Sequence, residues 1–550
     1  MEKILVVQLS RMGDLVQTLP LLKRLKQEKA DCEISLMCVR EFSEVIGNSR
    51  LADRLIYLPF GDVKKVLKPD DQVNLSNIDP ILEIPELRED YDFIINLTHT
   101  LGSGRICERV NGKRKTGRIN AHDGEIRLSG DWVKYLFAFS RNRTQNPFNL
   151  VDMYVGIGGI PQKPIEDYLE VAADDRDKAY ALLKANGYEE KGRLIAFQMG
   201  ANKLHRAWPA DNFVLLADQL IKRTDVEIVL LGSEKEREIG DRFQRQAEFP
   251  VIDLIGKTGL ADLPAVIEHC DLLISNDTGP IHIAAAVKTK VLGLYFSTAY
   301  FSETAPYGKG NVIIQAELPC SPCHEREMCE EMECRNYLSV EAVSQVAEMI
   351  LDGKSDLSFD FPNLSVYQSG FLSNGTLVYA PISSTISEQY QAGFMNRVMW
   401  EAALGLEHDR SFVEELMPRM RTVDGFAAKV EEYKKGLNRL MEEYSLGIKA
   451  AQKIIKEFGR RPINQARVIS LAEDLGKVET NISKLDGSLG MIKHLHNIEI
   501  MDMDFVQYPE LARQFKDKYS KLWGIAKLFI RNLEAELIPE PDRPGYKKGN

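Results

Sequence analysis

The sequence predicts an α/β protein with two doubly wound, Rossmann-like domains that face a cleft, followed by a small β-hairpin and an α-helical bundle domain. Short apolar runs typical of buried strands alternate with amphipathic helical segments over residues 1–165, and the alternation repeats over residues 166–353. After Gly353 the pattern changes to a hairpin signal and then to helical periodicity.

The first domain, residues 1–165, is expected to contain a parallel sheet. Strands separated by helices pair through crossover connections, which makes them parallel. The predicted strands are Ile4–Gln8, Glu33–Met37 and Phe93–Leu97, with a helix at Val16–Leu25.

The second domain, residues 166–353, follows the same order of elements. Ligands of such folds bind beyond the carboxyl ends of the strands, so the cleft between the two domains is the expected binding site. The predicted strands are Leu194–Gln198, Val226–Leu231, Val251–Leu254, Leu272–Ser275 and Lys290–Tyr295. The predicted helices are Asp174–Asn186, Ala210–Arg223, Glu234–Gln246, Ala261–His269 and Gly279–Val287.

The remaining chain divides into a hairpin or linker over 354–385, a helical bundle over 386–538 and a disordered tail over 539–550. Asn374-Gly375 is a favoured hairpin dipeptide. Gly459–Pro462 predicts a turn between two antiparallel helices. Two heptad seams indicate coiled-coil-like packing, either inside the bundle or at a homo-oligomer interface. They are Phe426, Val430, Tyr433, Leu437, Leu440 and Tyr444, then Leu471, Leu475, Val478, Ile482, Leu485, Leu489 and Ile492.

Charge and composition exclude several classes of protein. The 550 residues include 70 basic and 81 acidic side chains, for a net charge of −11, so we expect no nucleic-acid binding. No apolar run is long enough for a transmembrane helix, and the first residues do not resemble a signal peptide. We therefore expect a cytoplasmic protein, with peripheral contact at the inner membrane left open.

A loop after the first predicted strand carries Gly13 and Asp14. Gly13 allows a ligand to approach the backbone closely. Asp14 suits a general base that deprotonates a substrate hydroxyl, and it equally suits a helix cap. The pattern alone does not decide between these two roles.

Three further loops follow predicted strands of the second domain. Asn276–His282 opens a helix, where free N–H groups and the helix dipole favour a phosphate. Lys203 and Arg206 lie in an upstream loop, where a cation could stabilise a diphosphate leaving group or remain solvated. Glu236, in Gly232–Glu236, could accept hydrogen bonds from ribose hydroxyls or serve only as a first-turn acid.

Five segments together resemble glycosyltransferase family 9, the ADP-heptose:lipopolysaccharide heptosyltransferases and their relatives. The resemblance covers about residues 1–350. The segments are Gln8–Pro20, Arg206–Pro209, Gly232–Glu236, Asn276–His282 and Thr304–Gly308.

The resemblance implies a GT-B fold and an inverting sugar transfer that needs no obligatory metal. It implies that Asp14 is the general base, that Arg206 contacts the nucleotide diphosphate and that Glu236 binds the ribose. Donor sugar and phosphates would lie against the turn at the start of the second-domain helix, formed by Asp277, Thr278 and Gly279, with His282 in the same helix start or serving only in packing. Gly13, Gln17 and Lys203 would lie at the acceptor side of the cleft.

Two departures from the family pattern keep the acceptor open. Many relatives carry His where this chain has Gln17, and the helical extension of nearly 200 residues is unusual for the family. We expect transfer of heptose from ADP-heptose to a lipopolysaccharide core hydroxyl. The alternatives are a protein acceptor, such as flagellin or a surface protein, and a non-catalytic nucleotide-binding scaffold.

Four cysteines lie close together in the sequence, at Cys320, Cys323, Cys329 and Cys334. Four thiolates within fifteen residues could hold a structural zinc or iron ion. The alternative is a set of reduced thiols in a surface loop. His324 is the nearest histidine and is expected to be a bystander.

Overall fold

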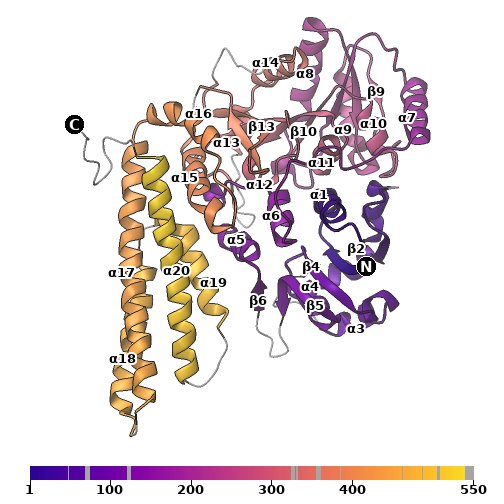
Figure 1. Cartoon of the computed structure of the whole chain (residues 1–550). Coiled ribbons are helices and arrows are strands. Elements are labelled where there is room, and N and C mark those ends of the chain that lie inside the picture. The colour runs from indigo at the N-terminus through magenta and orange to yellow at the C-terminus, as the bar shows by residue number, and fades with distance from the viewer. Residues whose placement is uncertain are drawn as a thin grey trace. The chain divides into compact units, whose positions relative to one another are not determined.

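The computed structural model describes residues 1–47, 49–68, 75–120, 126–323, 329, 332–354, 361–384, 386–460, 462–485, 487–503 and 508–538. Contacts divide the chain into two units (Figure 1). The first contains Met1–Gly130 and Phe148–Ser387, and the second contains Asp131–Pro147 and Glu388–Asn550. Residues 131–147, predicted within the first domain, therefore group with the C-terminal helices. The exact domain limits stay a prediction.

The first lobe of the first unit is a six-stranded sheet in the order β3-β2-β1-β4-β5-β6, parallel except for β6. Its strands are β1 (Glu2–Gln8), β2 (Cys32–Val39), β3 (Arg54–Leu58), β4 (Tyr91–Asn96), β5 (Gly112–Asn120) and β6 (Ile126–Ser129). Its helices are α1 (Met12–Glu28), α2 (Phe60–Val66), α3 (Asp79–Leu82) and α4 (Leu101–Arg109). Short 3-10 turns occupy Arg40–Ile46, Leu75–Asn77 and Pro85–Arg88.

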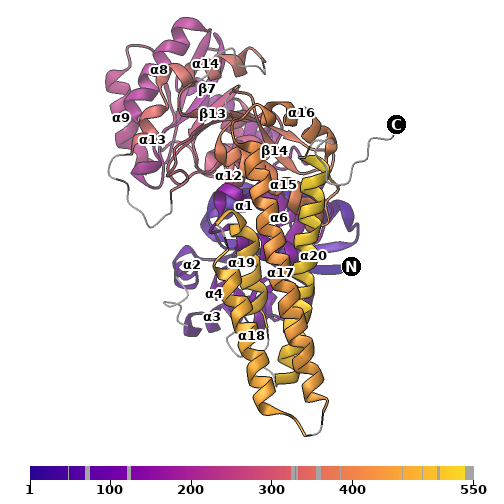
Figure 2. The ribbon, with the colours of Figure 1, turned by 90° about the vertical axis from the view of Figure 1, so that its left-hand side faces the viewer.

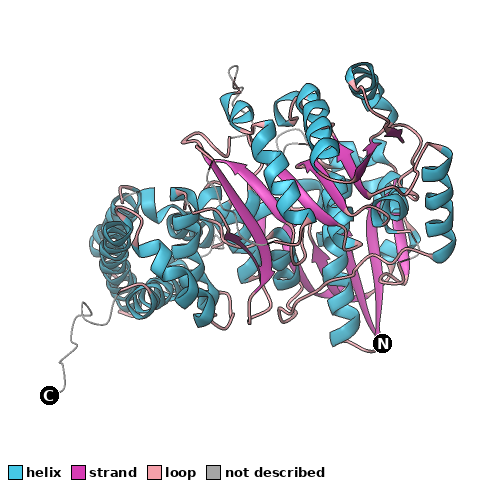
Figure 3. Ribbon diagram, turned by 90° about the horizontal axis from the view of Figure 1, so that it is seen from above, coloured by secondary structure: helices cyan, strands magenta, loops and turns pink. Residues whose placement is uncertain are grey.

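The second lobe is an eight-stranded sheet in the order β14-β13-β12-β11-β10-β7-β8-β9. Figure 3 shows strands of the chain in magenta with helices in cyan beside them. Its strands are β7 (Arg193–Gln198), β8 (Val226–Leu231), β9 (Ile252–Asp253), β10 (Leu272–Asn276), β11 (Lys290–Tyr295), β12 (Val312–Ala316), β13 (Leu364–Phe371) and β14 (Leu377–Pro381). The predicted hairpin is β13–β14, and it pairs antiparallel with β12 as part of this sheet. The helices are α7 (Ala173–Ala185), α8 (Ala210–Arg223), α9 (Arg237–Gln246), α10 (Leu263–Glu268), α11 (Gly279–Ala286), α12 (Phe301–Thr304), α13 (Glu333–Tyr337) and α14 (Val340–Leu351).

The central strands of both lobes carry continuous apolar runs, as expected for strands of a parallel sheet that is covered by helices on both faces. Ile4–Val7 in β1 and Leu272–Ile274 in β10 are fully buried. The two predicted doubly wound lobes are thus present. Their parallel strands direct their carboxyl ends, and the loops that follow, toward one edge of each sheet.

Helix α6 (Leu150–Ile157) joins the two lobes within the first unit. The Tyr154 hydroxyl lies 3.4 Å from Gln8 Nε2 in β1 of the first lobe. Asp152 is fully buried and accepts hydrogen bonds from the Tyr307 hydroxyl at 3.1 Å and from the Leu377 N–H at 3.1 Å, both in the second lobe. One short helix therefore forms hydrogen bonds to both lobes.

The second unit is helical, and its long helices α17 and α20 lie side by side (Figure 2). The apolar residues of the earlier heptad seam are buried in α17. The chain turns between α17 and α18 at the predicted break. The helices are α5 (Asp131–Phe139), α15 (Glu388–Ala403), α16 (Arg410–Arg421), α17 (Phe426–Phe458), α18 (Gln465–Ser483), α19 (Gly490–Met501) and α20 (Tyr508–Glu536).

The prediction of one heptad seam through Ile492 is wrong. Helix α18 ends at Ser483, a 3-10 turn occupies Gly487–Leu489, and α19 starts at Gly490. Glycine disfavours a helix interior, so the two glycines here favour a turn over continuation. The seams form a bundle core, and the description of the region as a coiled coil is not supported. The predicted disorder of 539–550 lies outside the described residues.

A buried carboxylate links three helices of the second unit. Glu499 in α19 is fully buried, and it accepts hydrogen bonds from Lys134 at 3.0 Å, Lys518 at 2.7 Å and Lys521 at 2.8 Å. Despite desolvation, these lysines lower the pKa of Glu499 to about 2.

Within the described part of the chain, no helix has the length and apolar character needed to cross a membrane.

Candidate active site

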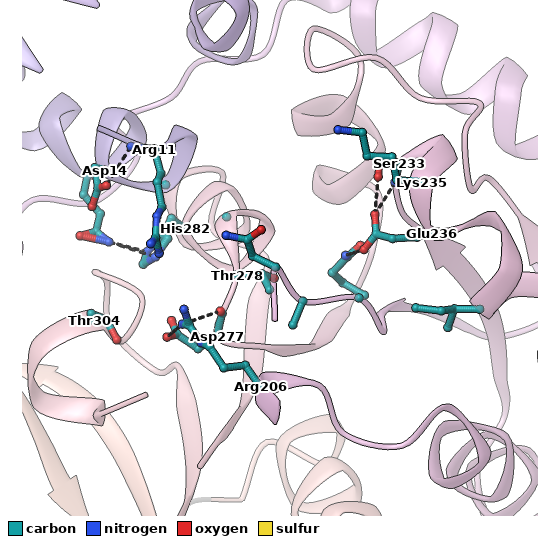
Figure 4. Close-up of a pocket in the computed structure, with 18 residues that line it drawn as sticks. Arg11, Asp14, Arg206, Ser233, Lys235, Glu236, Asp277, Thr278, His282 and Thr304 are labelled. Atoms are coloured by element: carbon teal, nitrogen blue, oxygen red, sulfur yellow. Dashed lines mark hydrogen bonds and ion pairs between the residues drawn. The ribbon is translucent and has the colours of Figure 1, made fainter. Parts of the chain in front are cut away.

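A pocket of about 590 Å³ lies between the two lobes of the first unit. The first lobe contributes the start of α1, and the second lobe contributes the loops that follow β7, β8 and β10 together with the start of α11 (Figure 4). The lining residues are Arg11, Gly13, Asp14, Gln17, Gln198, Gly200, Ala201, Asn202, Arg206, Ser233, Lys235, Glu236, Ile239, Asp277, Thr278, Gly279, His282 and Thr304.

Asp14 meets the structural requirements of both roles that the sequence allows, helix cap and general base. Its carboxylate accepts a hydrogen bond from the backbone N–H of Arg11 at 3.0 Å, so it satisfies a donor at the start of α1. It also lines the pocket. Burial raises the pKa of Asp14 above its usual value, and the nearby carboxylates of Asp277 and Glu303 add to this, while the Arg11 N–H opposes it. A carboxylate with a raised pKa is a better proton acceptor.

The start of α11 faces the same pocket. Thr278 is the N-cap residue, but its side chain makes no capping hydrogen bond to the helix. Its hydroxyl instead contacts Asn276 O at 3.2 Å and Ser275 Oγ at 3.1 Å. Pro280 has no N–H and the Ile281 N–H donates to Thr278 O at 3.3 Å, so the Gly279 N–H and the positive end of the helix dipole are the features that favour an anion in the pocket.

Asn276, at the end of β10, places the arginine-bearing loop. Its side chain accepts a hydrogen bond from the Trp208 N–H at 2.9 Å and donates one to Met199 O at 2.8 Å. Trp208 is buried, and its indole N–H donates to Leu338 O at 2.8 Å. This anchoring holds Arg206, two residues earlier, at the pocket wall.

Arg206 forms an ion pair with Asp277 in this structure. Its guanidinium also donates to the backbone carbonyl of Asp277 at 3.2 Å, and the Tyr295 hydroxyl lies 3.3 Å from the Asp277 carboxylate. The side chains of Arg206 and Asp277 are 14% and 9% exposed. The predicted diphosphate cation is thus already oriented by a carboxylate on the neighbouring loop.

Glu236 is held by three hydrogen bonds at the far end of the pocket. It accepts from Gln198 Nε2 at 2.8 Å, and from the N–H and hydroxyl of Ser233 at 2.6 and 2.7 Å. A Cβ on Gly200 would lie 1.5 Å from a Glu236 carboxylate oxygen, so any larger residue here would displace that carboxylate. The arrangement fixes a carboxylate that can accept from sugar hydroxyls.

Gln17 and His282 contact each other across the two lobes. Both are buried, and Gln17 Nε2 lies 3.0 Å from each ring nitrogen of His282. Burial lowers the pKa of His282 to about 4, so its imidazole is neutral at physiological pH.

The structure brings most of the predicted site residues together. Of the described residues predicted for the site cleft, Lys203 is the one that does not line the pocket. Residues that the sequence analysis did not select also line it: Arg11, Gln198, Gly200, Lys235 and Thr304. Arg11 was visible as a cation next to the Gly13-Asp14 pair, and Gln198 and Gly200 lie at the carboxyl end of a predicted strand.

The predicted metal site at the four cysteines is not supported. Among the described residues, no three His, Cys, Asp or Glu side chains form a group that could hold a metal ion. Cys320 and Cys329 are exposed, whereas Cys334 is buried. Burial raises the pKa of the Cys334 thiol, and Cys320 and Cys329 raise it further. His324 lies outside the described residues.

Part of the chain is similar in sequence to known glycosyltransferases. Residues 84–333 match the family model of glycosyltransferase family 9 (heptosyltransferase). Lipopolysaccharide heptosyltransferase 3 of Escherichia coli (strain K12) is 25% identical over 297 residues, which is 52% of this chain and 80% of that protein. Lipooligosaccharide heptosyltransferase 2 of Haemophilus ducreyi (strain 35000HP / ATCC 700724) is 28% identical over 335 residues, 57% of this chain and 88% of that protein.

The fold also matches a solved structure. The crystal structure of the glycosyl transferase family 9 from Veillonella parvula DSM 2008 superposes with a TM-score of 0.50 at 20% identity, covering 64% of this chain and 98% of that one. The α/β GT-B architecture predicted from the sequence is confirmed.

Proposed function

We propose that this glycosyltransferase family 9-like protein transfers a sugar from a nucleotide sugar to a hydroxyl of a lipopolysaccharide core, with inversion at the anomeric carbon. ADP-heptose is the proposed donor, in line with the family resemblance and with the heptosyltransferases that the chain matches. The observation that carries the proposal is the placement of Asp14, with its raised pKa, in one pocket with the Asp277–Gly279 turn.

The second lobe is the proposed donor site. The diphosphate lies at the start of α11, where the Gly279 N–H and the helix dipole favour negative charge. Arg206 is close enough to this turn to share its charge between Asp277 and the diphosphate. Glu236 accepts hydrogen bonds from the ribose. This places the reactive sugar between the Asp277–Gly279 turn and the first lobe.

The first lobe is the proposed acceptor site. The Asp14 carboxylate takes the proton from the acceptor hydroxyl as its oxygen bonds to the anomeric carbon. The bond from this carbon to the diphosphate oxygen breaks, and the nucleoside diphosphate leaves with the electron pair. Attack from the face opposite the leaving group inverts the configuration. The α11 dipole and Arg206 stabilise the charge that develops on the leaving group.

Arg11 is a positively charged residue on the proposed acceptor side of the pocket. It lines the pocket next to Asp14, is exposed, and its positive charge partly offsets the burial that raises the pKa of the Asp14 carboxyl. An exposed cation beside the proposed base favours an acceptor that carries a phosphate or carboxylate near its reactive hydroxyl. A lipopolysaccharide core meets that requirement.

The proposal is tested by incubating the full chain with a panel of nucleotide sugars and a delipidated lipopolysaccharide core, and by detecting the product by mass spectrometry. The expected result is a mass increase of one heptose with ADP-heptose, and NMR of the product gives its anomeric configuration. Transfer from another nucleotide sugar alone would overturn the donor, and retention of configuration would overturn the mechanism. Transfer to a protein acceptor in a parallel reaction, with none to the core, would overturn the acceptor.

A further inference from the structure

Two buried polar side chains meet where the lobes touch beside the proposed base. Gln17 follows Asp14 by three residues on α1, and His282 follows Gly279 by three residues on α11. The spacing places each residue about one helical turn from a pocket residue, on the same helix face. Gln17 and His282 are 4% and 5% exposed. Figure 4 shows His282 on the side of the pocket that carries Asp14.

The backbone around this pair fits closely. A Cβ on Gly13 would lie 2.9 Å from His282 Cδ2, and a Cβ on Gly279 would lie 2.1 Å from Met12 Cε. The glycines therefore let the starts of α1 and α11 approach each other. The position of His282 against Gly13 defines how far Asp14, the next residue, lies from the donor turn.

The chemistry of the pair suits a fixed contact. A neutral imidazole has one N–H donor and one acceptor nitrogen, and the amide of Gln17 has both kinds of group. Gln17 contacts His282 through Nε2, and among the described residues its Oε1 has no hydrogen-bond partner. A neutral His282 also places no positive charge beside Asp14, so it does not lower the proton affinity of that carboxylate.

We propose that Gln17 and His282 act together as positioning residues, which hold Asp14 at a set distance from the Asp277–Gly279 turn, rather than as separate contacts to acceptor and donor. The inference rests on the proposed function. It assigns Gln17 a role toward the second lobe, whereas the sequence placed it at the acceptor. It assigns His282 a role toward the first lobe, whereas the sequence placed it at the donor.

A double-mutant cycle with Gln17→Met and His282→Leu tests the inference in the full-length enzyme. Each single variant leaves one buried polar partner unsatisfied, and we expect kcat to fall about tenfold, with the KM for the donor changed less than about twofold. The double variant replaces both partners by apolar groups, so we expect kcat no more than about twofold below that of either single variant.

Tyr168→Phe is the matched control, because it removes a buried hydroxyl that donates to Tyr307 O at 2.9 Å in the same unit but outside the pocket. Its kcat should match the wild type. Thermal unfolding of all variants separates misfolding from mispositioning, and an ADP titration by calorimetry should give the same Kd for each folded variant.

The outcomes are distinct. Effects of Gln17→Met and His282→Leu that multiply to about a hundredfold loss would show independent roles and overturn the inference. A raised KM for the acceptor in Gln17→Met alone would show that Gln17 contacts the acceptor. Weaker ADP binding in His282→Leu alone would show that His282 contacts the donor. Either result would also overturn the inference. Failure of the proposed function would appear elsewhere, as the absence of transfer by the wild-type chain.

Discussion

Replacing Asp14 by Asn separates its structural role from its proposed chemical role. The carboxylate accepts a hydrogen bond from the Arg11 N–H at 3.0 Å. Asn keeps an acceptor oxygen for this bond but cannot take a proton from a hydroxyl. Ala loses both functions. The pair of variants therefore decides between helix cap and general base, which the sequence left open.

The expected magnitudes follow from these contacts. Asp14→Asn should lower kcat about 100- to 10,000-fold, since it removes general-base catalysis. This corresponds to about 3–5 kcal/mol of lost transition-state stabilisation. Asp14→Ala should show the same loss of kcat and, in addition, about 1 kcal/mol lower stability from the missing cap.

The pH dependence of stability gives a second readout. The pKa of Asp14 is raised in the folded protein, so the folded state holds its proton to a higher pH than the unfolded state. Its contribution to stability is therefore complete below the unfolded pKa, and is lost as the pH rises through the folded pKa. Asp14→Asn should be at least as stable as the wild type at pH 8, and the pH-dependent loss should disappear.

The assay combines initial rates over pH 5–9 with thermal unfolding at the same pH values. Asp62→Asn, which changes a first-turn acid of α2 outside the pocket, is the matched control and should leave kcat unchanged. Wild-type rates should fall on the acidic side, as the base becomes protonated. Near-wild-type turnover by Asp14→Asn would refute the reasoning, because the carboxylate would then be only a cap.

Three further predictions concern other contacts. Gly200→Ala should raise the donor KM about tenfold with little change in the unfolding temperature, because the new Cβ displaces Glu236; an unchanged KM would argue against ribose binding there. Arg206→Gln should weaken ADP binding about tenfold or more in calorimetry, since it removes the cation at the Asp277 turn, and equal affinity would place the diphosphate elsewhere. Glu499→Ala should lower the free energy of unfolding in urea by about 1–3 kcal/mol, because Lys134, Lys518 and Lys521 each lose a charged hydrogen bond while keeping a second carboxylate partner. The contribution of the native Glu499 should be present above about pH 4.5 and lost toward pH 2, and a variant with wild-type stability at pH 7 would contradict this.

Local sequence patterns were enough to predict the architecture and the position of the candidate site. Strand and helix periodicities are local, so the alternation over residues 1–353 could be read without coordinates. Loops that follow parallel strands meet at one sheet edge, which is why Asp14, Glu236 and Asp277 could be placed in one cleft. The motif order was enough to indicate the family before any geometry was known.

Contacts between side chains that are distant in the sequence depend on tertiary packing. Arg206 pairs with Asp277 and Gln17 with His282 across 71 and 265 residues, and no local periodicity encodes such partners. Lys134 and Glu499 are also far apart in the sequence, and their hydrogen bond links residues 131–147 to the C-terminal helices. The heptad pattern continues past Ser483, but α18 ends there and a turn that contains Gly487 precedes α19, which starts at Gly490, because glycine disfavours a helix interior. Local pattern sets the elements, and packing between distant segments sets the chemistry of the site.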